Sequence, residues 1–411
     1  MVGLLRFIFV LALSFCILLT KAQGYKVVEG KILAEDNSPV QYASIVLIPE
    51  MIGTVSNEEG IFELKIPENA ENDSLMISCV GYKRICISVS KIVGKLNIQL
   101  IHSDITLQEV TIRPVNYRDL IRKAIGKIKN NYPNTPTLSE THLCYEVKQN
   151  QKYIIFFDGS LKIKIPDYSK YGKFFTSYLI DKRIYLKDKD MSRYYYGDYA
   201  GNILAELFLT NQDFIKNINK YDFYSKSLTT MNDDIAYEID FKPLNKERPF
   251  SYTGKIYIDT TNLAILHLEY SLIENHKNRK LAYYLLDKKV DGSKYISEIS
   301  RSNYKVNFIK GNNEKYYINF IDYDSDVNIS CKEANISDKF QSKCRYIFID
   351  HNYYDNQFVD LNEFSLFSFK LKNPDSFKNP HGTVLNRYIN EMLDNKIEEL
   401  KKEYPDIEFS E

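Results

Sequence analysis

Histidine and cysteine are two of the residue types in this chain that could hold a metal ion or act as a nucleophile. The six histidines are His102, His142, His267, His276, His351 and His381. None is followed three residues later by Glu, and no His-Glu-x-x-His occurs, although a catalytic zinc needs imidazoles and a carboxylate around an open position. A Gly-x-Ser-x-Gly elbow and a phosphate-cradling glycine-rich loop are missing as well. Each histidine is therefore interpreted as a surface or edge residue, and the sequence predicts a protein that is not an enzyme and has no metal or cofactor.

Cysteine spacing suggests cross-links rather than catalysis. The cysteines after the first 22 residues are Cys79, Cys86, Cys144, Cys331 and Cys344. Cys79 and Cys86 flank a turn at Tyr82-Lys83, and facing positions on paired strands lie within reach of a disulfide. Cys331 and Cys344 bracket a polar loop, and closing it would contribute about 3 kcal/mol. The alternative is that all five are small buried hydrophobes. No Cys-x-x-Cys occurs, so redox catalysis and a cysteine-rich zinc site are unsupported.

The start of the chain is typical of a secretory signal peptide. A short apolar run over residues 7–19 is followed by Thr20-Lys21-Ala22, which places small residues before a cleavage point at Gln23. Lipid attachment at Cys16 would need a small residue before it, but Phe15 is large. No later stretch reaches the roughly 18 apolar residues of a membrane helix. We expect export to the periplasm or to the outer membrane's surface, with no transmembrane span after signal removal.

Composition indicates a folded, β-rich chain and argues against nucleic acid as a partner. Hydrophobic residues make up 44% of the sequence, with 33 Tyr and 23 Phe, and Lys plus Arg equal Asp plus Glu at 54 each. A net charge of zero gives no electrostatic attraction to a phosphate backbone. The expected partner is an unidentified envelope protein, glycan or lipid. Tyrosine runs could stack on a glycan, but tyrosine is also an ordinary strand residue.

Short alternating strands separated by turn residues occupy the region after the signal peptide. In the stretch 60–66, Phe62, Leu64 and Ile66 fall on one face, while Glu63 and Lys65 fall on the other. About seven such strands at this spacing are typical of an immunoglobulin-like or transthyretin-like sandwich.

The order of motifs in this region resembles a known family. These motifs are Gly30, Pro39, Ala43-Ser44-Ile45, Gly53-Thr54, Glu59-Gly60-Ile61-Phe62, Val80-Gly81-Tyr82 and Leu107-Gln108-Glu109-Val110. They resemble the carboxypeptidase-regulatory-like domain, which is common at the N-terminus of Gram-negative envelope proteins, TonB-dependent receptors included. The resemblance implies an accessory β-sandwich without peptidase chemistry. Asn57-Glu58-Glu59-Gly60 departs from the family's more usual Thr-Asp-x-x-Gly, which weakens any calcium site there.

The remaining chain reads as one helix followed by a larger β-rich part. Apolar residues at three- and four-residue steps between Leu120 and Ile128 predict a helix that ends at residues 130–133. It could dock a partner or pack on the next domain. Beyond it, Ile154–Ile165 predicts two strands around a turn, and residues 255–270 predict a hairpin around Asp259–Asn262. A transmembrane barrel is not expected, because charges interrupt the apolar rows.

Part of this second region resembles the curved half-barrel of periplasmic lipoprotein carriers, namely residues 236–241 leading into 254–259. In those proteins an antiparallel sheet wraps a helix and shelters acyl chains. A helix over residues 202–218 would then cover the groove. Its apolar residues that would line this groove are Leu204, Leu207, Phe208 and Phe214.

The sequence thus predicts a mainly β protein with a seven-strand sandwich and a larger antiparallel β-rich domain with few helices. The expected parts are a signal peptide (1–22), the sandwich (23–113), a linker helix (114–135), the β-rich domain (136–375) and an amphipathic C-terminal helix with its tail (376–411). The expected role is a structural or binding module of the envelope. The alternative is a periplasmic carrier of lipid or lipoprotein with a curved sheet as its groove.

Overall fold

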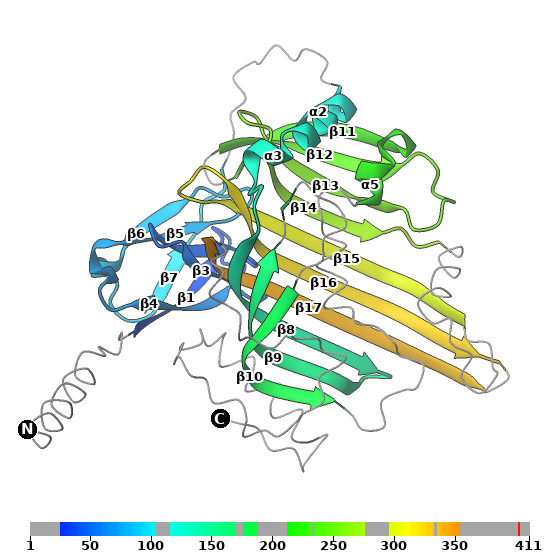
Figure 1. Ribbon diagram of the computed structural model, residues 1–411, viewed down its shortest axis with the longest axis horizontal. Coiled ribbons are helices and arrows are strands. Elements are labelled where there is room, and N and C mark those ends of the chain that lie inside the picture. The colour runs from blue at the N-terminus through cyan, green and yellow to red at the C-terminus, as the bar shows by residue number, and fades with distance from the viewer. Residues whose placement is uncertain are drawn as a thin grey trace, which may run out of the picture.

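The computed structural model shows a small β-sandwich packed against one long, twisted antiparallel sheet (Figure 1). It describes residues 25–103, 116–165, 167–168, 176–187, 212–231, 234–275, 296–332, 335–353 and 402. The mainly β fold class expected from the sequence is confirmed. The expected signal peptide, including Cys16, and the expected C-terminal helix lie outside the described residues.

Seven strands in two sheets form the sandwich, as predicted. They are β1 (Tyr25–Leu33), β2 (Ser44–Ile48), β3 (Ile52–Val55), β4 (Ile61–Pro67), β5 (Ser74–Ser78), β6 (Ile85–Ser88) and β7 (Leu96–Gln99), with 3-10 turns η1 (Ala70–Asn72) and η2 (Val89–Lys91). One sheet has the order β4-β1-β7 and the other β3-β2-β5-β6. Ile32 and Phe62 from the first sheet and Ile45 and Ile77 from the second are fully buried in one apolar cluster between them.

A ten-stranded antiparallel sheet makes up the second part. Its strands are β8 (Thr137–Gln149), β9 (Lys152–Ile165), β10 (Thr176–Lys187), β11 (Tyr221–Met231), β12 (Asp234–Pro243), β13 (Tyr252–Asp259), β14 (Ile265–Leu272), β15 (Ile296–Lys310), β16 (Tyr316–Cys331) and β17 (Ile336–Tyr353). Their order is β10-β9-β8-β17-β16-β15-β14-β13-β12-β11. The chain therefore builds one edge with β8 to β10, begins again at the other edge with β11, and returns strand by strand until β17 pairs with β8.

The prediction for residues 154–165 was wrong, whereas the hairpin over 255–270 is confirmed. Asp158 and Gly159 look like turn residues, but they lie in the middle of the continuous strand β9, opposite Cys144 and Leu143 of β8. Asp158 is 3% exposed and pairs with His142 across the ladder. The long β8 ladder thus overrides the local turn preference.

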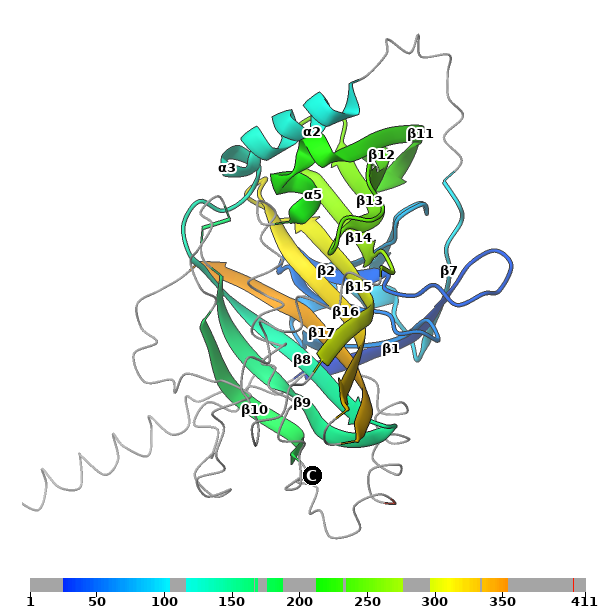
Figure 2. The ribbon, with the colours of Figure 1, turned by 90° about the vertical axis from the view of Figure 1, so that its right-hand side faces the viewer.

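Short helices cover one face of the sheet, and the sandwich lies on the other (Figure 2). The helices are α2 (Tyr117–Gly126), α3 (Ile128–Asn131) and α5 (Asp213–Lys216), with the 3-10 turn η3 (Ile218–Lys220). Asn116 caps α2 by accepting a hydrogen bond from the backbone N–H of Asp119. Ile121, Ala124 and Ile128 are buried in the sheet's apolar cluster, so the linker helix packs on the second part of the chain.

The strand register separates both predicted cysteine pairs, so neither disulfide forms. Cys331 faces Ile336, and Cys344 faces Tyr323, eight residues along β16 from Cys331. At about 3.3 Å per residue, this is far beyond disulfide distance. Cys86 faces Met76, while Cys79 lies beyond the end of β5. None of the five described cysteines is in a disulfide.

Candidate functional site

The contact between the sandwich and the sheet, here called the seam, is where the structure brings polar side chains together. Side chains alternate along β14, so Leu268 and Tyr270 enter the apolar cluster on the helix side while His267 and Glu269 face the sandwich. Apolar contacts hold the seam at two places: Val55 with Phe320 and Ile347, and Val46 and Met76 with Ile309.

Hydrogen bonds also cross the seam at several points. The Asn319 amide donates to the Ser44 hydroxyl over 3.0 Å, and Arg345 Nη2 donates to the Tyr42 hydroxyl over 3.0 Å. The backbone N–H of Gly81 donates to the Thr230 carbonyl over 3.2 Å. The sandwich is therefore held on the sheet in one orientation.

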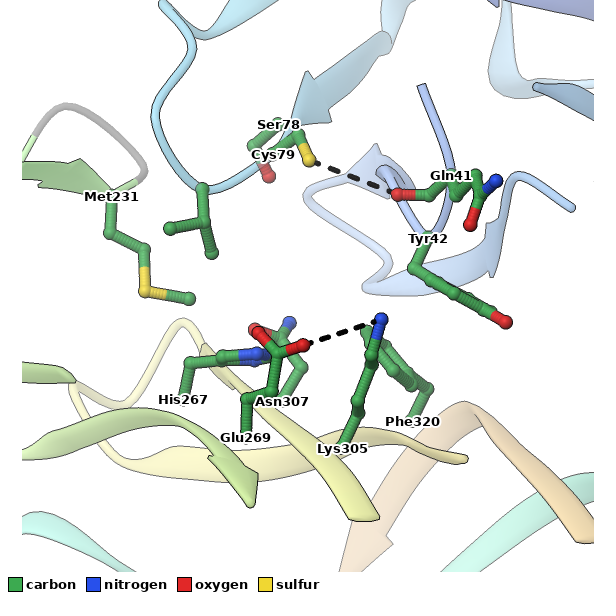
Figure 3. A pocket seen from close by; sticks show the side chains of 11 residues that line it. Gln41, Tyr42, Ser78, Cys79, Met231, His267, Glu269, Lys305, Asn307 and Phe320 are labelled. Carbon is green, nitrogen blue, oxygen red and sulfur yellow. Dashed lines mark hydrogen bonds and ion pairs between the residues drawn. The ribbon is translucent and has the colours of Figure 1, made fainter. Parts of the chain in front are cut away.

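A cavity of about 150 Å³ opens between these contacts (Figure 3). This seam cavity is lined from the sandwich by Gln41, Tyr42, Ser78, Cys79 and Val80, and from the sheet by Met231, His267, Glu269, Lys305, Asn307 and Phe320. Neither part of the chain encloses it alone, so the site exists only when the two are docked.

His267 is a buried polar residue that lines the seam cavity. It is 7% exposed, and its Nδ1 has no hydrogen-bond partner among the residues that the structure describes. Burial is the main reason that the pKa of His267 falls to about 4, and nearby Lys305 lowers it further. Glu269 and a hydrogen bond with Asn307 oppose this shift. The imidazole is therefore neutral at pH 7.

An ion pair forms the outer edge of the cavity. Glu269 on β14 and Lys305 on β15 are direct cross-strand partners, and Glu269 Oε1 lies 3.6 Å from Lys305 Nζ. Their side chains are 48% and 35% exposed. Lys305 Nζ also lies 5.1 Å from the ring centroid of Tyr42, which stacks on Phe320 at 5.5 Å. The entrance thus carries one charge of each sign beside an aromatic wall.

Cys79 does not supply a reactive nucleophile at this site. Burial raises the pKa of its thiol to about 11, although Lys305 and a backbone hydrogen bond oppose the shift. The thiol is therefore protonated at neutral pH, and only the thiolate is strongly nucleophilic. The groups that the seam cavity presents are suited to holding a molecule by hydrogen bonds and charge.

The described residues contain no group of three His, Cys, Asp or Glu side chains placed to hold a metal ion. No described helix is long and apolar enough to cross a membrane.

Of the four residues predicted to line a groove, the structure describes only Phe214. It lies on α5, is fully buried, stacks on Phe241 with centroids 4.2 Å apart and meets Tyr270 edge-on. It is therefore a core residue. Leu204, Leu207 and Phe208 lie outside the described residues.

The interpretation of all histidines as surface or edge residues was wrong at two positions. His142 is 2% exposed beside Asp158, and His267 lines the seam cavity. His102 is exposed and stacks on Tyr82, as expected. The alternation of β14 could have placed His267 and Glu269 together on one face. It could not have shown that the sandwich covers them, because the covering residues lie more than 180 positions earlier.

Comparison with known families decides the nature of the first part. The family model of the CarboxypepD_reg-like domain matches residues 28–112. Residues 28–112 are a CarboxypepD_reg-like domain. The seam cavity thus lies between the CarboxypepD_reg-like domain and the ten-stranded sheet. No curated protein matches the chain significantly.

Solved structures of three bacterial proteins show distant similarity to the chain. A DUF1329 family protein from Desulfovibrio piger is 12% identical over 60% of this chain and 95% of its own, with a TM-score of 0.26. A putative outer membrane lipoprotein-sorting protein domain from Vibrio parahaemolyticus is 9% identical over 58% and 92%, with a TM-score of 0.25. A LolA superfamily protein from Nitrosomonas europaea is 11% identical over 59% and 94%, with a TM-score of 0.22. Similarities of this size do not assign a function.

Proposed function

We propose that this is an exported, non-catalytic binding protein of the cell envelope, and that its ligand site is the seam cavity. In this proposal the signal peptide directs the chain to the periplasm or the outer membrane's surface. The CarboxypepD_reg-like domain supplies one wall of the site, and the ten-stranded sheet supplies the other. The domain division given by the sequence (23–113, 114–135, 136–375 and 376–411) is part of the same proposal.

The observation that carries the proposal is the buried His267 in a cavity shared by two units. A buried polar atom without a partner costs free energy, so such atoms are rare unless a ligand, ion or water meets them. Here the residue that carries this atom lines a cavity that also holds an exposed ion pair. Concave sites with apolar walls and a few convergent polar groups are the usual form of small-molecule sites.

Small molecules released from the purified protein test this proposal. Wild-type protein isolated from the envelope fraction is washed and unfolded, and the released compounds are measured by mass spectrometry. We expect wild type to release one compound in a near-stoichiometric amount. Val80→Phe should fill the cavity, so the Val80→Phe protein should release none of this compound. Val93→Phe is the matched control, because Val93 is 90% exposed and far from the lining set. The proposal would be contradicted if wild type, Val80→Phe and Val93→Phe all released the same compounds. It would also be contradicted if none of the three released a compound after incubation with envelope extract.

The carrier alternative is supported by a separate observation on the helix side of the sheet. Tyr270, Tyr304 and Tyr323 form a continuous aromatic row, with ring centroids 4.7 Å apart at each step. Such a surface could shelter an acyl chain if the sheet acts as a half-barrel. These rings are at most 5% exposed, and Phe214 of α5 packs on Tyr270, so the described part of this face resembles a filled core. Organic extraction should recover near-stoichiometric lipid if the protein is a carrier, and no lipid if the seam cavity is the site.

A further inference from the structure

We infer that the seam cavity takes a small zwitterion, a free α-amino acid with an apolar side chain. This inference rests on the proposed function and names the ligand class of the same site. It follows from how two neighbouring strands arrange acceptors and donors on the sheet side of the cavity.

The two strands present complementary pairs of polar groups. His267 and Glu269 lie two residues apart on β14, and Asn307 and Lys305 lie directly opposite them on β15. His267 and Asn307 are cross-strand partners, and the Asn307 side chain favours the protonated ring of His267. Because Nδ1 has no partner among the described residues, Nε2 is the ring nitrogen left for the Asn307 side chain.

Acceptors therefore lie along β14 and donors along β15. An ammonium group above β14 would donate to the Glu269 carboxylate beside the His267 ring. A carboxylate above β15 would accept from Lys305 Nζ and from the Asn307 amide nitrogen. A free α-amino acid carries both charged groups on one carbon. A ligand with only a positive charge would contact Glu269 but not Lys305, and a ligand with only a negative charge would contact Lys305 but not Glu269.

The size and walls of the cavity limit the side chain. A cavity of about 150 Å³ accommodates a molecule about the size of benzene. Its apolar walls come from Val80, Met231 and Phe320, and the Met231 side chain extends toward His267 (Figure 3). A compact branched or thioether side chain fits these surfaces, while a second charged group would find no partner among them.

Calorimetric titration with three matched probes tests the ligand class. L-Valine carries both charges, isobutylamine lacks the carboxylate, and 3-methylbutanoate lacks the ammonium. We expect valine to bind and each truncated probe to bind at least tenfold more weakly, because each loses one charge-assisted contact. Leucine and methionine probe the side-chain limit in the same way. Equal binding of valine and either truncated probe would overturn the inference.

Glu269→Gln and Lys305→Met test the two charged contacts, and both residues are half-exposed, so the fold should tolerate the changes. Each should weaken valine binding at least tenfold. Glu314→Gln and Lys310→Met are the matched controls, since this ion pair flanks the β15–β16 turn outside the cavity lining. The controls should bind as wild type does. Unchanged valine affinity in both cavity variants would overturn the inference.

The outcomes separate this inference from the proposed function. If no amino acid binds, but a released compound disappears in Val80→Phe, the zwitterion is wrong and the seam cavity is still a binding site. If no amino acid binds and Val80→Phe changes nothing, both are wrong.

Discussion

His267 should make the stability of the protein depend on pH. Its folded-state pKa of about 4 lies below the ordinary value of 6.5, so the unfolded chain binds the proton more readily. The free energy of unfolding is therefore unaffected by His267 above pH 6.5. It falls by about 3 kcal/mol as the pH falls from 6.5 to 4, because the unfolded chain takes up the proton first. The groups that act on the imidazole are Glu269 on its own strand, Lys305 and Asn307 on β15, and Tyr257 on β13, whose ring meets it edge-on at 5.5 Å. Urea unfolding at a series of pH values measures the effect.

Two glutamine variants separate His267 from other titrating groups. Between pH 6.5 and 4 the free energy of unfolding should fall less in His267→Gln than in wild type. The difference between the two decreases should be about 3 kcal/mol. His102→Gln, at an exposed position on the sandwich, should retain the wild-type profile. Parallel pH profiles for wild type and His267→Gln would show that His267 is not buried as a neutral imidazole.

The cysteines should differ in their reaction with iodoacetamide. Cys86 is exposed and should be alkylated first, while Cys331 and Cys344 are at most 2% exposed and should react only after unfolding. Cys79 should react slowly at pH 8, because burial raises its pKa to about 11. Peptide mass spectrometry without reductant follows each site. Any pair that resists alkylation in denaturant until reductant is added would be a disulfide and would contradict the register.

Gly60 and Gly81 should respond differently to substitution by alanine. Both have positive φ, at +75° and +81°, which a side chain disfavours by about 1–2 kcal/mol. At Gly60 an added Cβ would also lie 2.3 Å from the Ile32 carbonyl oxygen, whereas nothing lies within 4 Å at Gly81. Gly60→Ala should therefore be clearly more destabilising than Gly81→Ala, and Gly81→Val should still be destabilising through φ. Equal melting temperatures for Gly81→Val and wild type would contradict the turn conformation.

At the scale of elements, the seam should make the sandwich and the sheet unfold together. Val55 is 1% exposed and packs on Phe320 and Ile347 of the sheet. Val55→Asp would bury a carboxylate in this contact and should split one unfolding transition into two, or lower the transition's midpoint strongly. Val93→Asp, at a 90% exposed position, should behave as wild type. Calorimetry decides, and a single unchanged transition in Val55→Asp would show that the seam adds no stability.

The elements that sequence patterns predicted best are those with strict local alternation. Phe62, Leu64 and Ile66 are all fully buried on one face of β4, as the period of two requires. Prediction failed where distant pairing decides the outcome. Asp158-Gly159 has turn chemistry, but β8 extends the ladder through it, and the cysteine pairs depended on a register that short-range patterns do not fix.

The candidate site was beyond sequence prediction for a related reason. Alternation places His267 and Glu269 on one face of β14, but the cavity forms only because the sandwich docks there. The docking contacts join residues far apart in the chain, such as Ser44 with Asn319 and Tyr42 with Arg345. No local pattern encodes pairs separated by 275 or 303 positions. A buried histidine and an exposed one look the same until the covering element is known.

For the whole molecule, the most direct test of the seam cavity is the imidazole nitrogen spectrum of His267. Histidine-labelled protein is recorded as isolated, after small molecules are removed by unfolding and refolding, and again with the released compounds added back. His267→Gln and His102→Gln assign the two signals. If the seam cavity is the ligand site, the Nδ1 signal of His267 shifts on removal and returns on addition, while His102 stays unchanged. A His267 signal that is identical in all three samples would contradict a ligand site at the seam.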